Sequence, residues 1–202
     1  QRRVEGINFD VRKTLLEYDD VLRQQREIMY EERNFVLESD DVRPVIRKMF
    51  ERVISDTIAA YRNPEAKDGG IDYENLREAL IKRKIIDEET TIEEIAGLDP
   101  KELQNILVED AWKKYEEKIE PVKDGFRRIE KEMVLHMIDR SWIDHIDAMD
   151  KLREGIHLRS YAQEKPLQAY VDEGFGMFEI MLSQIAENIV LFCMNVNVEH
   201  QQ

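Results

Sequence analysis

The segment that decides the fold runs from residue 135 to residue 156 and reads LHMIDRSWIDHIDAMDKLREGI. Its inner positions alternate between steps of three and four residues, which is the heptad spacing of a helix that packs lengthwise against another helix. These positions are Leu135, Ile138, Trp142, His145, Met149, Leu152 and Ile156. The segment from Leu167 to Phe192 has nearly the same spacing. Because a short connection ending at Pro166 separates the two stripes, the sequence predicts an antiparallel helical hairpin.

A further long helix is predicted upstream, from about Phe9 to Leu37. Its apolar positions again follow a heptad spacing, and Gln25 fills the one inner position that lacks an apolar residue. The apolar positions are Val11, Leu15, Tyr18, Leu22 and Met29. Between this helix and the hairpin, the prolines and capping residues predict a small helical subdomain over residues 41–121. The expected fold is therefore all-α: a long scaffold helix packed with an antiparallel two-helix finger, plus an inserted helical subdomain.

Composition limits the classes of function. The chain carries 30 basic and 44 acidic residues, a net charge of −14, which disfavours nucleic acid as a partner. Cys193 is the only cysteine, so no internal disulfide can form and a reducing compartment is expected. The longest unbroken apolar run, Ile189 to Met194, is far shorter than the roughly 20 residues of a membrane span.

No motif predicts catalysis or a bound cofactor. The glycines are scattered, and no phosphate-binding loop followed by Lys and Ser or Thr is present. Glu154 and His157 match the spacing of a di-iron ligand pair once, but no second pair exists and Gly155 is expected to break the helix between them. We interpret His145 as a hydrogen-bonded core residue rather than a metal ligand. Asp19 and Asp20 are neighbours on different helix faces, not an acid/base pair.

The connection between the two hairpin helices is the strongest candidate for function. It places an aromatic ring and several hydrogen-bond donors at the end of a long, stiff element, where they can contact a partner or a moving chain without covalent chemistry. The alternative is a loop that packs back on its own helices. The candidate residues are His157, Leu158, Arg159, Tyr161 and Gln163.

Two long signatures resemble one known family. Residues 3–13, RVEGINFDVRK, lead into Leu15 to Val21 and then Gln25-Arg26; residues 142–150, WIDHIDAMD, lead into Leu152 to Gln163 and Pro166. Both are similar to segments of SecA, the ATP-driven preprotein translocase family of bacteria, and they occur in the order found there. The first resembles the segment that follows the second motor domain, and the other resembles the two-helix finger and its tip.

The resemblance implies a domain organisation. Residues 1–40 correspond to the first helix of the helical scaffold, residues 41–121 to the helical wing, and residues 122–202 to the rest of the scaffold. The finger then covers about residues 126–196, with its tip at about 155–166. Tyr161 occupies the position of the tip tyrosine that contacts the translocating polypeptide. Arg26, Asp19 and Asp20 are candidates for contacts between domains.

The resemblance also implies partners and a location. These are the SecYEG channel, unfolded preprotein, and the motor and preprotein-crosslinking domains of the same parent chain, at the inner face of the cell membrane. ATP and Mg²⁺ would bind the motor domains, whose motifs are missing here, and the finger region would restrain ATP hydrolysis. A free-standing helical adaptor remains an alternative function, and a metal enzyme using His145 and His157 is a weaker one.

Overall fold

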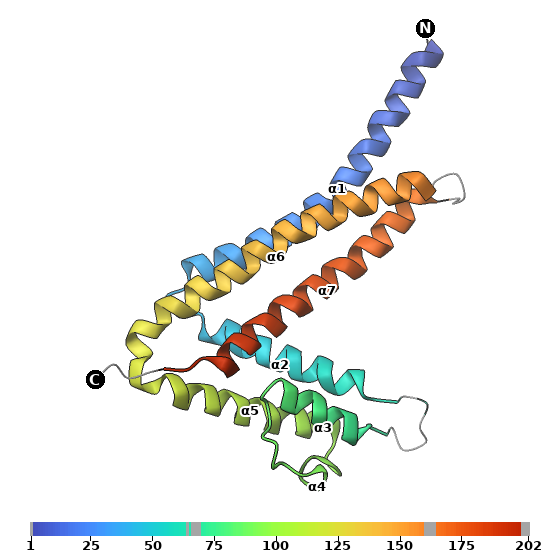
Figure 1. The fold of residues 1–202 in the computed structure, drawn as a ribbon. Helices are drawn as coiled ribbons and strands as arrows, with labels where there is room; N and C mark the ends of the chain where they lie inside the picture. Colours follow the sequence, from blue (N-terminus) through green and yellow to red (C-terminus); the bar gives the residue numbers. More distant parts are fainter. Residues whose placement is uncertain (1, 64, 66–69, 160–164, 199–202) are drawn as a thin grey trace. The chain divides into compact units, whose positions relative to one another are not determined.

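The computed structural model describes residues 2–63, 65, 70–159 and 165–198, and these form helices and their connections (Figure 1). Apart from one isolated bridge between Arg62 and Ile71, no β-structure occurs in these ranges. The predicted all-α fold is therefore confirmed. In chain order the helices are α1 (Arg2–Glu38), α2 (Arg43–Ala60), α3 (Tyr73–Lys82), α4 (Ile92–Ile95), α5 (Pro100–Ile119), the 3₁₀ turn η1 (Glu120–Val122), α6 (Lys123–Arg159) and α7 (Pro166–Asn195).

The chain divides into two compact units. Unit 1 consists of Gln1–Glu38 and Leu135–Leu182, and unit 2 consists of Ser39–Val134 and Ser183–Gln202. Unit 2 therefore contains the whole 41–121 segment, together with the beginning of α6 and the end of α7. Each unit is described by itself below.

In unit 1, α6 runs antiparallel to both α1 and α7. Contacts with α1 link residue 18 to 157, 25 to 145 and 33 to 139, so the numbers rise along one helix as they fall along the other. Contacts with α7 link residue 159 to 173 and 145 to 178, with the same sense. A core cluster of Tyr18, Met149, Ile156 and Tyr170 joins the three helices. The hairpin predicted from the two stripes is thus present.

The first four turns of α1 differ from the prediction. Val11 and Leu15 were expected to pack against another helix, but they are 53% and 45% exposed. All of residues 2–17 are exposed, whereas Tyr18, Gln25 and Met29 further along the stripe are buried. The heptad pattern correctly identifies the apolar face, and only its second half is covered within the described residues.

The expectation that Gly155 breaks the helix is wrong. Helix α6 continues through Gly155 to Arg159, and nothing lies within 4 Å of the position that a Cβ on Gly155 would take. A glycine inside a helix costs only about 1 kcal/mol relative to alanine. The neighbouring Ile156 is completely buried, and its packing offsets that cost.

Unit 2 is built around the packing of α2 on α5. Phe50 of α2 contacts Trp112 and Tyr115 of α5, with ring centroids 5.6 and 6.2 Å apart. The predicted start of α5 is confirmed, because the Asp99 carboxylate accepts a hydrogen bond from the Lys101 amide at 3.1 Å and Pro100 occupies the first turn. The contacts of Phe50 with Trp112 and Tyr115 hold α2 and α5 side by side.

Helix α7 has the length and composition of a membrane span, although no long unbroken apolar run is present. Its most apolar window of 18 residues has a mean hydropathy of 1.4, and 44% of that window is buried inside the protein. A helix at the centre of a protein core passes the same test. The composition of α7 therefore does not by itself indicate a membrane-spanning segment.

Candidate functional site

An aromatic cluster lies in unit 1, where the end of α6 meets α1 and the beginning of α7. The ring of Tyr18 lies 5.4 Å from the ring of His157 and 5.0 Å from that of Tyr170, between centroids. The Arg153 guanidinium lies 5.2 Å from the centre of the Tyr18 ring and donates to the Asp19 carboxylate at 2.8 Å. Tyr18 and Tyr170 are each 2% exposed. The cluster fixes the last turns of α6 against α1.

Three of the predicted tip residues, His157, Leu158 and Arg159, form the end of α6. Tyr161 and Gln163 lie outside the described residues. Leu158 is 81% exposed, and Arg159 donates two hydrogen bonds to the Glu173 carboxylate at 3.1 and 3.2 Å. His157 stacks on Tyr18. At the end of α6, one apolar side chain therefore faces solvent beside an ion pair between the two finger helices.

The candidates for domain contact lie close together on α1. Arg23 donates to the Asp20 carboxylate on the same helix at 3.0 Å, while Asp19 pairs with Arg153 of α6. Arg26 is half-buried and lines a groove of ≈ 1240 Å³ between α1, α6 and α7. Leu16 of α1 and Phe175 of α7, both largely exposed, line the same groove. The roles of these residues between domains remain predictions.

A buried polar chain connects the three helices of unit 1 at one level. The Gln25 side-chain amide donates to the carbonyl oxygen of Gly174 at 3.2 Å, and its Oε1 lies 2.7 Å from Nε2 of His145. Because Gln25 Oε1 can only accept, His145 must carry its proton on Nε2. Gln25 and His145 are 7% and 4% exposed. The interpretation of His145 as a hydrogen-bonded core histidine is confirmed.

Burial lowers the pKa of His145 below its ordinary value. Its ring packs between Trp142, 5.6 Å away, and Phe178, 5.7 Å away, so the charged form is poorly solvated. The bond to Gln25 needs only the proton on Nε2, and the neutral imidazole supplies it. Near neutral pH, the chain from His145 through Gln25 to Gly174 is therefore intact, and it sets the register of α6 and α7 against α1.

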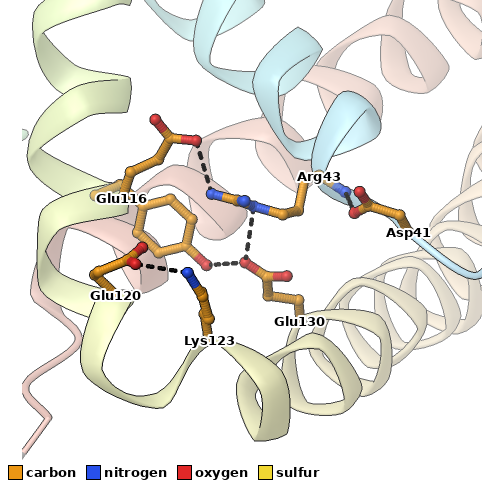
Figure 2. Close-up of polar contacts among 7 residues, drawn as sticks. Asp41, Arg43, Glu116, Glu120, Lys123 and Glu130 are labelled. Atoms are coloured by element: carbon orange, nitrogen blue, oxygen red, sulfur yellow. Dashed lines mark hydrogen bonds and ion pairs between the residues drawn. The ribbon is translucent and has the colours of Figure 1, made fainter.

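Unit 2 contains a second polar cluster, which the sequence analysis missed. Glu130 of α6 is 1% exposed, and its Oε1 accepts a hydrogen bond of 2.6 Å from the hydroxyl of Tyr115. Figure 2 shows the guanidinium of Arg43 between Glu130 and Glu116. Arg43 Nη2 donates to Glu116 Oε1 at 2.9 Å, whereas Arg43 Nε lies 3.9 Å from Glu130 Oε1. The signal that could have found Glu130 is its place four residues after Phe126 and four before Val134, both buried.

Burial dominates the titration of this cluster. It raises the pKa of Glu130 above the ordinary range, although Tyr115 and Arg43 act in the opposite direction. Burial also raises the pKa of the Tyr115 hydroxyl and, beside it, raises the pKa of the Cys193 thiol to about 12. Neither Tyr115 nor Cys193 therefore ionises near neutral pH, and Glu130 is the group in this cluster whose charge can change.

No metal site is found in the part of the chain that the structure describes. There, no three side chains of His, Cys, Asp or Glu come together closely enough to hold a metal ion. His145 donates to Gln25 and His157 stacks on Tyr18, so neither histidine is arranged with carboxylates as a ligand set. The weaker proposal of a metal enzyme gains no support from these two residues.

One comparison with known proteins bears on the whole chain. The family model described as the SecA Wing and Scaffold domain matches residues 1–197.

Proposed function

The chain belongs to the SecA wing and scaffold family, and we propose that it transmits the nucleotide state of motor domains to a polypeptide moving through the SecYEG channel. Membership makes it a component of a SecA-like protein translocase, associated in general with the translocon and with preprotein. The proposal adds a division of labour within the chain: α1 meets the motor and preprotein-crosslinking domains, and the α6–α7 finger meets channel and substrate.

The observation that carries the proposal is the uncovered apolar face at the start of α1. Its residues Val4, Ile7, Val11 and Leu15 are 45–61% exposed and repeat at steps of three and four. One or two exposed apolar side chains need no explanation, but a stripe about three turns long on a helix favours a protein partner. In a SecA-like parent, the motor and crosslinking domains are the partner that fits.

To transmit a movement of α1, the α6–α7 finger must be rigid and must not slide along α1. The antiparallel α6 and α7 are held to each other and to α1 by the His145–Gln25–Gly174 chain and, further along, by the aromatic cluster around Tyr18. A buried polar contact between packed helices specifies one register, since any slip leaves a buried group without a partner. A displacement of α1 would therefore be carried to the end of α6 as a rigid movement.

Tyr161, in the connection between α6 and α7, is proposed to bind the translocating polypeptide. A tyrosine ring and hydroxyl can contact any chain, whatever its sequence. Leu158, Arg159, His157 and Gln163 are proposed to contact the polypeptide or the channel as well. ATP and Mg²⁺ would be bound by the motor domains, with none bound by this chain, and the finger region would restrain ATP hydrolysis in the absence of channel or substrate. We propose that the parent acts at the inner face of the cell membrane.

The first experiment adds the purified chain to separately produced motor domains of its parent and measures ATP hydrolysis. We expect a saturable change in rate. Ile7→Asp, which puts a charge in the exposed apolar stripe, should abolish it. The matched control is Lys13→Asp, on the same exposed part of α1 but not on the stripe, and it should leave the response within about twofold. Equal responses to both variants would refute docking through the stripe.

The same titration tests the adaptor alternative. If the chain forms a stable oligomer through the stripe and has no affinity for the motor domains, the adaptor function is favoured. The tip and the domain contact are tested in the full-length parent. There, Tyr161→Ala should slow preprotein translocation, and Arg26→Glu should alter ATP turnover. Wild-type rates in either variant would exclude the corresponding role.

A further inference from the structure

We propose that Glu130 is a proton-sensitive latch in unit 2: it accepts the hydrogen bond from Tyr115 of α5 and, when charged, draws Arg43 away from Glu116 while its charge stays buried. The latch would control how firmly the two ends of the 41–121 segment are attached to α6. Arg43 stands in the first turn of α2 and Tyr115 in the last turns of α5, so one carboxyl meets both ends of that segment.

Two buried atoms of this cluster lack a hydrogen-bond partner, and a small movement would give one of them, Arg43 Nε, a partner. Glu130 Oε2 and Arg43 Nε are both buried and have no hydrogen-bond partner. Arg43 Nε lies 3.9 Å from the other carboxyl oxygen of Glu130. A hydrogen bond between a guanidinium and a carboxylate is about 2.8 Å long, so a shift of about 1 Å would form it. Buried unpaired atoms of this kind are rare in proteins and call for an explanation.

Arg43 also pairs with the carboxylate of Glu116, and this ion pair can break at little cost. Its Nη2 bonds to Glu116, whose side chain is 45% exposed, while Glu130 is 1% exposed. A solvated carboxylate loses little when its partner leaves, because water replaces the partner. A buried carboxylate without a partner costs much more. When Glu130 is neutral, Arg43 therefore stays with Glu116; when Glu130 is charged, the balance moves toward Glu130.

The surroundings of Glu130 determine in which direction the latch responds to pH. Titratable groups of several elements lie around Glu130. They are Asp41, just before α2; Arg43 in α2; Tyr115 and Glu116 in α5; Arg127 in α6; and Cys193 in α7. Burial outweighs the two arginines and the tyrosine, so the folded pKa of Glu130 lies above its unfolded value near 4.5.

The sign of the pH effect follows from linkage. Between the unfolded and the folded pKa, the folded state holds one proton more than the unfolded state. The stabilisation by Glu130 is thus complete below about pH 4.5 and is lost as pH rises through the folded pKa. The opening equilibrium of α2 and α5 should then rise by up to about tenfold per pH unit in that window.

Hydrogen exchange tests the latch in the 202-residue chain itself. The exchange rates of α2 and α5 amides in wild type are divided by those in Glu130→Gln at each pH, which removes the intrinsic pH dependence of exchange. We expect this ratio to rise from pH 4.5 upward and then level off. Glu132→Gln is the matched control on the same helix, at an exposed ion pair with Arg128, and it should exchange like wild type. A ratio that is constant from pH 4.5 to 8 overturns the proposal.

Carboxyl NMR tests the same idea by following the titration of Glu130 directly, first in the wild-type chain. The Glu130 resonance should titrate above its ordinary pKa, and Tyr115→Phe, which removes the donor to the charged form, should raise the midpoint further. Glu116→Gln should lower the midpoint, because Arg43 then has no competing carboxylate. A midpoint near 4.5, or one that Glu116→Gln does not move, contradicts the exchange of Arg43 between the two partners. Both outcomes are independent of any role in protein translocation.

Discussion

Replacement of Gly174 by alanine tests how closely α6 and α7 pack in unit 1. A Cβ at this position would lie 2.8 Å from Cε and 3.2 Å from Sδ of Met149. Met149 is completely buried, so its thioether has little room to move away. Gly176, two residues further along α7, has nothing within 4 Å of the same position. Gly176→Ala is therefore a matched control in the same helix.

The expected free energies of unfolding follow from two opposing effects. Both substitutions gain about 0.8–1 kcal/mol of helix propensity. Only Gly174→Ala also forces an extra methyl group into a filled core, at a cost of about 1–3 kcal/mol. We therefore expect Gly176→Ala to stabilise unit 1 by roughly 0.5–1 kcal/mol and Gly174→Ala to change it by about 0 to −2 kcal/mol. The difference between the two variants isolates the contact with Met149.

Tryptophan fluorescence can report unit 1 alone. The chain has two tryptophans, and Trp142 is the one in unit 1. In a Trp112→Phe background, urea unfolding followed by Trp142 fluorescence gives the stability of that unit for each glycine variant. Equal stabilisation by Gly174→Ala and Gly176→Ala would refute the close packing of Met149 on Gly174. A Met149→Ala change should remove the difference between them, because it removes the atoms that the new Cβ meets.

Other properties of the two units can be checked in the same way. Unit 1 should lose stability as pH falls below about 6.5, because unfolded His145 takes up a proton that burial denies it in the folded state, and His145→Gln should flatten that part of the urea midpoint profile. Lys84 has a φ of 57°, so Lys84→Gly should stabilise unit 2 by about 1 kcal/mol, measured by Trp112 fluorescence in a Trp142→Phe background. Cys193, buried and with a pKa of about 12, should react with iodoacetamide at pH 8 only as fast as unit 2 opens, so added urea should accelerate labelling in parallel with unfolding.

The sequence could predict which faces of the helices are apolar, but not which of them are covered. The heptad spacing along α1 continues without a change from Val11 to Met29, yet Val11 is 53% exposed and Met29 is 2% exposed. Periodicity describes one helix, whereas burial depends on whether a second helix lies beside it. Helix α6 ends at Arg159, and none of the described residues of unit 1 covers Val11. The same limitation explains Gly155, where buried neighbours outweigh a local preference against helix.

Three buried polar residues show how far the apolar spacing of a helix can predict buried hydrogen bonds. Gln25, His145 and Glu130 each stand at an inner position where the spacing calls for an apolar side chain, and all three are less than a tenth exposed. A polar residue survives there only if a partner satisfies it, so its position alone predicts a buried hydrogen bond. Its position does not identify the partner, because that depends on the register between helices more than a hundred residues apart, as for Gln25 and His145.

The burial of Glu130 could not be predicted from the spacing because many charged residues surround it near the start of α6. Residues 127–132 include five charged side chains, which together are typical of a solvated face. Only the step of four from Phe126 to Glu130, and of four again to Val134, separates the buried carboxyl from its exposed neighbours Arg128 and Glu132. In both units, then, polar exceptions within an apolar stripe add buried hydrogen bonds between helices. The apolar positions bring the helices together, and the hydrogen bonds of the buried polar residues favour one register between them.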